Sequence, residues 1–143
     1  MPGLDGLIFK WWDPLNSVSK KINQWTPHRV NSETEIEEDL YNYLSTIFPG
    51  LIIRRQFNYD RIRADLLIED TVAIEIKMNL TSTSEFQRLI GQLESYARWG
   101  KRMIVLIVGD VDPDLKHRVQ ERINKDWDDD SSKLIHIKLN EKV

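Results

Sequence analysis

The sequence predicts an α/β protein in which a mixed sheet is flanked by helices. Three short segments with strand-like patterns follow one another, and a continuous apolar run at Met103–Val108 is typical of a strand covered on both faces. Amphipathic segments with clear start and stop signals separate these strands. The expected order is helix, three strands, helix, strand, helix, strand, after a short N-terminal helix.

Residues 1–32 differ from the rest and are expected to form a Trp-rich N-terminal arm. After Pro14, apolar residues recur at spacings of three and four, which predicts a short amphipathic helix that ends before Pro27. The helix could pack on the core, bind a partner protein or a second copy, or lie on a membrane surface. The membrane option is the weakest, because the polar face is not strongly basic.

The main domain is expected over residues 33–143. Ser32 and Glu35 fit a capping box that opens a helix through Phe48, where Pro49-Gly50 stops it. The three extended segments that follow are Leu51–Phe57, Arg61–Ile68 and Val72–Met78.

The second half of this domain alternates helices and strands. A long helix is expected from Ser82 or Ser84 to Trp99, with Gly100 as its C-terminal cap. After the run at Met103–Val108, Asp112-Pro113 opens a helix to about Asn124. Leu134–Leu139 alternates and is expected to be an edge strand.

Composition excludes several kinds of chemistry. There is no cysteine, so disulfides, thiolate nucleophiles and cysteine-based zinc sites are excluded, and the three histidines lie far apart. A metal site must therefore be built mainly from carboxylates, which favours hard cations such as Mg²⁺ or Mn²⁺. The net charge of −3 argues against a simple nucleic-acid-binding module, but less against a nuclease with acidic metal ligands. Without a membrane-length apolar stretch or a secretory signal in Met1–Trp12, a cytoplasmic protein with no membrane partner is expected.

Charged residues interrupt two neighbouring strands. Alternation places Arg61, Arg63, Asp65 and Leu67 on one face of the second strand, and Glu75 with Lys77 on one face of the third. Charges in the middle of an apolar strand require partners or a metal. Asp65 and Glu75 meet only if the connecting loop has an odd number of residues or a bulge. A two-residue turn would put Asp65 opposite Ile74, on the wrong face.

The segment Arg63-Ala64-Asp65 followed by Glu75-Ile76-Lys77 resembles the D-(x)n-E-x-K motif of the PD-(D/E)xK nuclease superfamily. That superfamily includes restriction endonucleases, Holliday junction resolvases and RecB-type nuclease domains. The resemblance implies a restriction-endonuclease-like αβββαβ core over about residues 33–109. Ala64 stands where the family nominally has proline.

The resemblance also implies roles for individual residues. Asp65, Glu75, the carbonyl of Ile76 and Glu37 of the first helix would hold Mg²⁺, with Mn²⁺ as a substitute. Lys77 would position the attacking water and stabilise charge in the transition state.

Two features outside the central motif bear on the site: the choice of acid from the first helix remains open, and a second motif adds to the resemblance. Glu33 and Glu38 rival Glu37 as the acid from the first helix. Gln92 and Tyr96 share a helix face and look like the QxxxY motif of RecB-type nucleases, so Gln92 would orient the site or touch the nucleic-acid backbone.

Basic residues near the motif predict phosphate contacts. The residues expected to bind nucleic acid are Arg54, Arg55, Arg61, Arg63, Arg88 and Tyr96. The leading interpretation is a Mg²⁺-dependent endonuclease that cuts DNA, with branched or junction DNA as one option for the substrate. By the resemblance it acts as a homodimer. A catalytically inactive binding or assembly module and an RNA-directed nuclease remain the alternatives.

Overall fold

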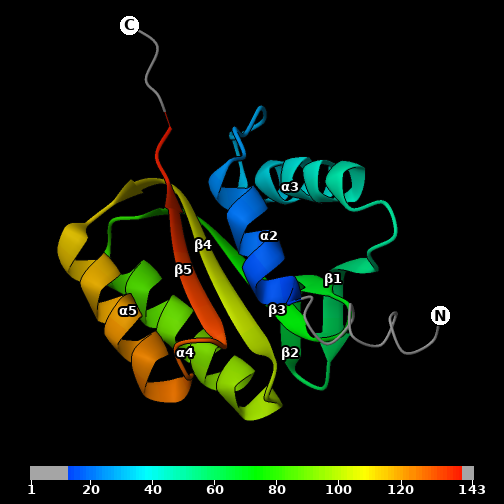
Figure 1. Ribbon diagram of the computed structural model, residues 1–143. Helices are drawn as coiled ribbons and strands as arrows, with labels where there is room; N and C mark the ends of the chain where they lie inside the picture. Colours follow the sequence, from blue (N-terminus) through cyan, green and yellow to red (C-terminus); the bar gives the residue numbers. More distant parts are fainter. Residues whose placement is uncertain (1–12, 140–143) are drawn as a thin grey trace, which may run out of the picture.

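The computed structural model describes residues 13–139, so Trp11, Trp12 and the rest of the expected arm before Asp13 lie outside the described residues. Figure 1 shows the elements in the predicted order. They are α2 (Pro14–Asn23), α3 (Glu33–Ile47), β1 (Ile53–Tyr59), β2 (Ile62–Ile68), β3 (Val72–Leu80), α4 (Thr83–Trp99), β4 (Arg102–Val111), α5 (Pro113–Asp126) and β5 (Ser132–Ile137).

The five strands form one mixed sheet in the order β1-β2-β3-β4-β5. The pairs β1–β2 and β2–β3 are antiparallel, whereas β3–β4 and β4–β5 are parallel. The parallel pairs are joined through α4 and α5, as a crossover connection requires. The prediction of an α/β protein with a mixed sheet is confirmed, and β5 lies at the sheet edge as expected.

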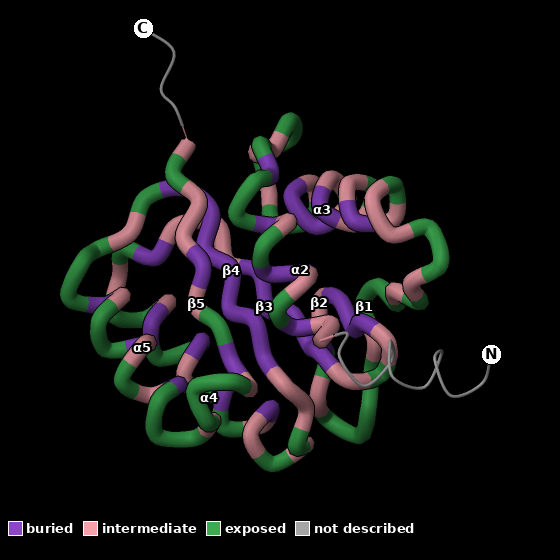
Figure 2. Tube along the Cα trace, in the orientation of Figure 1, coloured by how far each residue is buried: buried purple, intermediate pink, exposed green. Residues whose placement is uncertain are grey.

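Helices cover both faces of the sheet (Figure 1). Helices α2 and α3 lie over one face, and α4 and α5 lie over the other. The apolar run in β4 supplies both cores by alternation. Ile104, Leu106 and Val108 face α2 and α3, and Met103, Val105 and Ile107 face α4 and α5. Figure 2 shows the buried residues concentrated along the central strands.

Local signals in the sequence start and stop the helices as predicted. The Ser32 hydroxyl accepts a hydrogen bond from the Glu35 backbone N–H at 3.1 Å, and the Asp13 carboxylate caps α2 ahead of Pro14. Gly100 ends α4 with a φ of 79°, a left-handed conformation that glycine adopts without steric cost.

Helix α2 is part of the main core. Leu15, Val18 and Ile22 are buried in the same cluster as the sheet residues beneath them, together with Trp25 just after the helix. The described part of the N-terminal region therefore packs on the sheet. Within residues 13–139 no helix combines the length and apolar character needed to cross a bilayer.

Several strand boundaries differ from the prediction. Strand β1 runs to Tyr59, which pairs with Ile62, so the expected turn at Asn58–Asp60 shifts to Asp60 and Arg61. Leu51, the expected start of the first strand, lies in the loop before β1 and packs against the core. Strand β5 begins at Ser132, two residues earlier than expected, because Ser132 already pairs with Met103.

The β2–β3 hairpin has the register that a shared site requires. Ile68 pairs with Val72 and Leu66 with Ile74, so the loop consists of the three residues Glu69–Thr71. Glu69 and Asp70 adopt left-handed conformations, with φ of 50° and 55°. Extended by one pair, this register sets Asp65 opposite Glu75, as the odd-numbered loop was predicted to do.

Candidate active site

Glu75 is a buried acid in the middle of β3. Only 2% of its surface is exposed, and its neighbours along the strand are apolar. Burial raises the pKa of Glu75 well above its usual value, and the negative charge and hydrogen bonding of Asp65 raise it further. Lys77 and the hydroxyl of Tyr96 act in the opposite direction and lower it. Burial and the neighbouring acid therefore favour the protonated form of the Glu75 carboxyl group, and a cation beside it would favour the ionised form.

Asp65 lies where β2 and β3 separate. Its Oδ2 accepts a hydrogen bond from the Ile76 backbone N–H at 2.7 Å, just beyond the last paired residues, Leu66 and Ile74. One step further along β3, Glu33 Oε2 accepts a hydrogen bond from the Met78 N–H at 3.0 Å. Acidic side chains from two other elements thus satisfy backbone donors that an adjacent strand would otherwise bind.

A kink in the β1–β2 hairpin accounts for the position of Asp65. Arg55 pairs with Leu66 and Phe57 with Ala64, but the intervening pair, Gln56 and Asp65, is missing from the ladder. Gln56 has a left-handed φ of 48°. Leu66 packs on the α2–α3 side, whereas Ala64 packs on the α4–α5 side.

The predicted uninterrupted alternation from Arg61 to Leu67 is therefore wrong, because the strand changes face at Asp65. A regular strand would keep residues 64 and 66 on one face. This change allows Asp65 to reach both Gln56, at 3.4 Å, and the backbone of β3.

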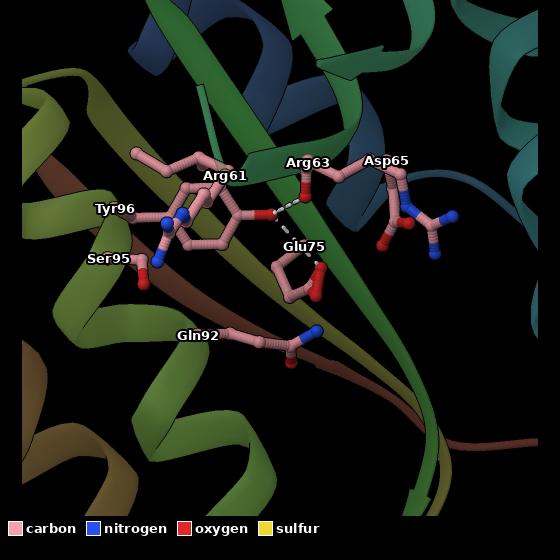
Figure 3. A pocket seen from close by; sticks show the side chains of 8 residues that line it. Arg61, Arg63, Asp65, Glu75, Gln92, Ser95 and Tyr96 are labelled. Carbon is pink, nitrogen blue, oxygen red and sulfur yellow. Dashed lines mark hydrogen bonds between the residues drawn. The ribbon is translucent and has the colours of Figure 1, made fainter. Parts of the chain in front are cut away.

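Tyr96 of α4 ties the helix to the buried acid. Its hydroxyl lies 2.6 Å from the Arg63 carbonyl oxygen and 3.2 Å from Glu75 Oε1, and its single hydrogen is shared between these two acceptors (Figure 3). The side chain is only 1% exposed, and burial followed by the nearby charge of Glu75 raises the pKa of Tyr96 above its usual value. The enclosed hydroxyl of Tyr96 holds Glu75 in place, and a contact of Tyr96 with nucleic acid stays a prediction.

A cavity of about 170 Å³ opens beside these groups. Figure 3 shows side chains from β2, β3 and α4 around it. The residues that line it are Arg61, Ile62, Arg63, Asp65, Glu75, Gln92, Ser95 and Tyr96. The buried carbonyl oxygen of the Gln92 side chain has no hydrogen-bond partner within the described residues. Such an acceptor suits a donor that enters the cavity, for example a water molecule.

Glu37, the acid expected from the first helix, lies next to this site without joining it directly. It is only 3% exposed, its Oε2 lies 3.2 Å from Arg55 Nε, and its other oxygen accepts a hydrogen bond from the Gln56 amide. In the described part of the chain, no three acidic or histidine side chains converge as a metal cluster. Glu37 reaches Asp65 only through Gln56, so the expected direct set of three carboxylates is not assembled. The rival Glu38 faces Arg29 at 3.6 Å.

The expected cationic residues divide into two groups. Arg61 and Arg63 are exposed and line the cavity. Arg55 pairs with Glu37 and lies over the Tyr41 ring, both on α3, and its role in binding nucleic acid stays a prediction. Arg54 and Arg88 are exposed on β1 and α4.

The donor chemistry fits a hard divalent cation. Asp65 and Glu75 supply carboxylate oxygens side by side, which is the ligand type that Mg²⁺ and Mn²⁺ prefer. Two acids this close do not both ionise readily without a countercharge. Lys77 lies on the same face of β3 as Glu75, and its charge already favours the ionised form of that acid.

Comparisons with known proteins add little to this site. Neither protein-family models nor curated proteins give a match to the sequence. Among solved structures, the chain is similar to SfsA of Pyrococcus furiosus in complex with Ca²⁺, at 17% identity and a TM-score of 0.46. The match covers 74% of this chain and 59% of that protein, so the chain spans less than two thirds of its length. At this similarity the fold and the site rest on the residues described above.

Proposed function

We propose that this protein is a metal-dependent nuclease that hydrolyses phosphodiester bonds, with Asp65 and Glu75 as the metal ligands. The observation that carries the proposal is the buried acid Glu75 beside Asp65 at the wall of an open cavity. Their proximity disfavours ionisation of Glu75, and a divalent cation would relieve that cost. The carbonyl of Ile76 is the expected backbone ligand.

The residues around the pair fit the steps of phosphodiester hydrolysis. A bound Mg²⁺ would polarise the phosphate and lower the pKa of a bound water. Lys77 stabilises negative charge that builds on the phosphate. The carbonyl oxygen of Gln92 would accept a hydrogen bond from a water molecule in the cavity, and Tyr96 fixes the position of Glu75.

DNA is the substrate that we propose, with Arg61 and Arg63 as phosphate contacts at the mouth of the cavity. Endonucleolytic cleavage, a preference for branched DNA and action as a homodimer follow from the resemblance to resolvases. RNA is the other nucleic acid to which the same phosphate chemistry applies. A protein partner that binds through the N-terminal arm would add to this activity.

The test compares wild type with Glu75→Ala and Lys77→Ala on labelled duplex, branched and single-stranded DNA and on RNA. Each reaction is run with Mg²⁺, with Mn²⁺ and with EDTA. Glu121→Gln is the control, since Glu121 is an exposed acid on α5. We expect metal-dependent cleavage that falls by about 10²–10³-fold or more in the two site variants. Cleavage that persists in EDTA or in both variants would contradict the proposal.

A second candidate is an inactive nuclease-like module that binds nucleic acid or assembles with a partner. The neutralisation of Glu37 by Arg55 favours it, because one expected metal ligand is already occupied. Calorimetric titration with Mg²⁺ and Mn²⁺ separates the two candidates. Folded protein that binds neither metal and cleaves no substrate would support the inactive module.

A further inference from the structure

Three aromatic rings form a stacked group beside the cavity. Tyr59 and Trp99 stack with centroids 5.7 Å apart and an interplanar angle of 15°. Phe57 and Trp99 stack at 6.0 Å and 10°. Phe57 and Tyr59 lie two residues apart on β1 and share a face, and Trp99 comes from the last turn of α4. We call Phe57, Tyr59 and Trp99 the aromatic platform.

Tyr59 is the exposed edge of this platform. It is 55% exposed, whereas most large apolar side chains of the described chain are buried. Its ring is held by the stack with Trp99 and by the strand pair that Tyr59 makes with Ile62. A rigid and accessible aromatic ring suits stacking by another flat ring, because little conformational freedom is lost when it binds.

Cationic groups surround the platform. The Arg54 guanidinium lies 5.9 Å from the centre of the Phe57 ring, and Lys101 Nζ lies 5.3 Å from the centre of the Trp99 ring. Asp70 partly neutralises Lys101 at 3.4 Å, and Asp60 adds a negative charge in the turn after Tyr59. Arg61, next in the chain, is exposed and lines the cavity. Flat aromatic surface combined with cations is the chemistry that binds bases and phosphates of single strands.

The platform is continuous with the site. Tyr96, which holds Glu75, also contacts Trp99 at a centroid distance of 6.4 Å. Ile62 of the cavity wall pairs with Tyr59 across the hairpin. A nucleotide stacked on Tyr59 would therefore direct its neighbouring phosphate along Arg61 toward Asp65 and Glu75.

We propose that the aromatic platform binds an unpaired nucleobase, so that the strand presented to the carboxylate pair is single-stranded. The substrate class is thus a single strand, or the unpaired part of a branched or gapped nucleic acid. A base inside a duplex cannot offer its face to Tyr59, because neighbouring base pairs cover it. The inference rests on the proposed nuclease function for cleavage of the bound strand, but stacking of the base can be measured without cleavage.

The experiment measures binding of the full chain in EDTA, by fluorescence anisotropy of labelled oligonucleotides. The probes are a single strand of deoxyadenosine, the same length of RNA, the matching duplex, and an abasic strand with the same phosphates. The variants are Tyr59→Ala, Tyr59→Phe and Ile52→Ala. Ile52 is the matched control, since it is 58% exposed but lies outside the platform.

We expect wild type to bind the single strand more tightly than the duplex or the abasic strand. Tyr59→Ala should weaken that binding by roughly 5- to 100-fold, the range found for loss of one stacking ring, while Tyr59→Phe and Ile52→Ala keep it. Equal binding by Tyr59→Ala and wild type would overturn the proposal, as would equal binding of the abasic strand. The DNA and RNA probes distinguish the two sources of the base.

Failure of the nuclease proposal would give different results from failure of the platform proposal. Hydrolysis of bis(p-nitrophenyl) phosphate requires the carboxylate pair but no stacked base. Base-dependent binding without metal-dependent hydrolysis of this small ester would leave the platform intact and reject the nuclease. Hydrolysis that Tyr59→Ala leaves unchanged, combined with base-independent binding, would reject the platform alone.

Discussion

Replacement of Tyr96 by phenylalanine tests the link between α4 and the buried acid. The change removes one hydroxyl and keeps the ring in the buried α4–α5 core, to which Leu67 and Leu93 also belong. The hydroxyl hydrogen that Tyr96 shares between the Arg63 carbonyl and Glu75 Oε1 is lost. A neutral hydrogen bond contributes about 1 kcal/mol, and one to a charged group contributes about 2 kcal/mol. The expected loss in free energy of unfolding is about 1 kcal/mol where Glu75 is protonated and about 2 kcal/mol where it is ionised.

The direction of the pH dependence follows from the pKa of Glu75. Its folded-state pKa lies above the usual value of 4.5, so its contribution to stability is complete at low pH and declines as the pH rises through the raised pKa. The Tyr96 hydrogen bond lowers that pKa and so limits the decline. Without the hydroxyl the pKa rises further, and the destabilisation caused by Tyr96→Phe grows with increasing pH.

Urea unfolding of both proteins from about pH 5 to about pH 8, followed by tryptophan fluorescence in EDTA, measures this difference. Tyr43→Phe is the matched control, because the Tyr43 hydroxyl makes one hydrogen bond, 2.7 Å to the Lys21 carbonyl, away from the acid pair. The control should cost about 1 kcal/mol at every pH. A constant difference between Tyr96→Phe and wild type across the range would refute the coupling to Glu75.

Three further outcomes are expected. Mg²⁺ at about 100 times its dissociation constant should stabilise the wild type by about 2.7 kcal/mol, and Asp65→Asn or Glu75→Gln should abolish that gain in thermal unfolding. Glu37→Gln should weaken Mg²⁺ binding by less than about tenfold in calorimetry, because Glu37 reaches Asp65 only through Gln56. A complete loss of Mg²⁺ binding would instead indicate that Glu37 is a direct metal ligand. Gly109→Ala should lower the free energy of unfolding by at least about 1 kcal/mol, since Gly109 has a φ of 106° and its new Cβ would meet Asn79. Gly91→Ala, in the exposed interior of α4, should instead raise it by about 0.5–1 kcal/mol. Urea unfolding checks both glycine variants, and the opposite order would contradict the argument.

Elements with strong local signals could be predicted from the sequence. The cap at Ser32, the left-handed stop at Gly100 and the doubly covered strand at Met103–Val108 all follow from local periodicity and capping chemistry. From the sequence, Asp65 and Glu75 could be predicted to lie side by side only on the condition that the loop between their strands has an odd number of residues or a bulge. The structure satisfies that condition with three residues, two of them left-handed without being glycine.

Other parts of the site depend on contacts that no local pattern records. Gln56 adopts a positive φ, which is uncommon for a residue with a side chain and which the sequence does not indicate. At this position the β1–β2 ladder loses one pair, and β2 changes the face that its side chains occupy at Asp65. The pairing of Glu37 with Arg55 joins residues 18 positions apart. Tyr59 and Trp99 lie 40 positions apart, so their stack becomes visible only once α4 lies across the β1–β2 hairpin.

The odd loop and the kink at Gln56 are both needed for the site. The odd loop alone would place Asp65 opposite Glu75 on a closed ladder, where the backbones pair and the face is covered by α4. The kink separates the strands at that point, and Asp65 Oδ2 then takes the Ile76 N–H that the ladder would have used. Its Oδ1 accepts a long hydrogen bond from the Gln56 amide, at 3.4 Å. A cation beside Glu75 could therefore bind Oδ1 while Oδ2 keeps the edge of β3 satisfied, so the fold does not have to break a backbone hydrogen bond to accept the metal.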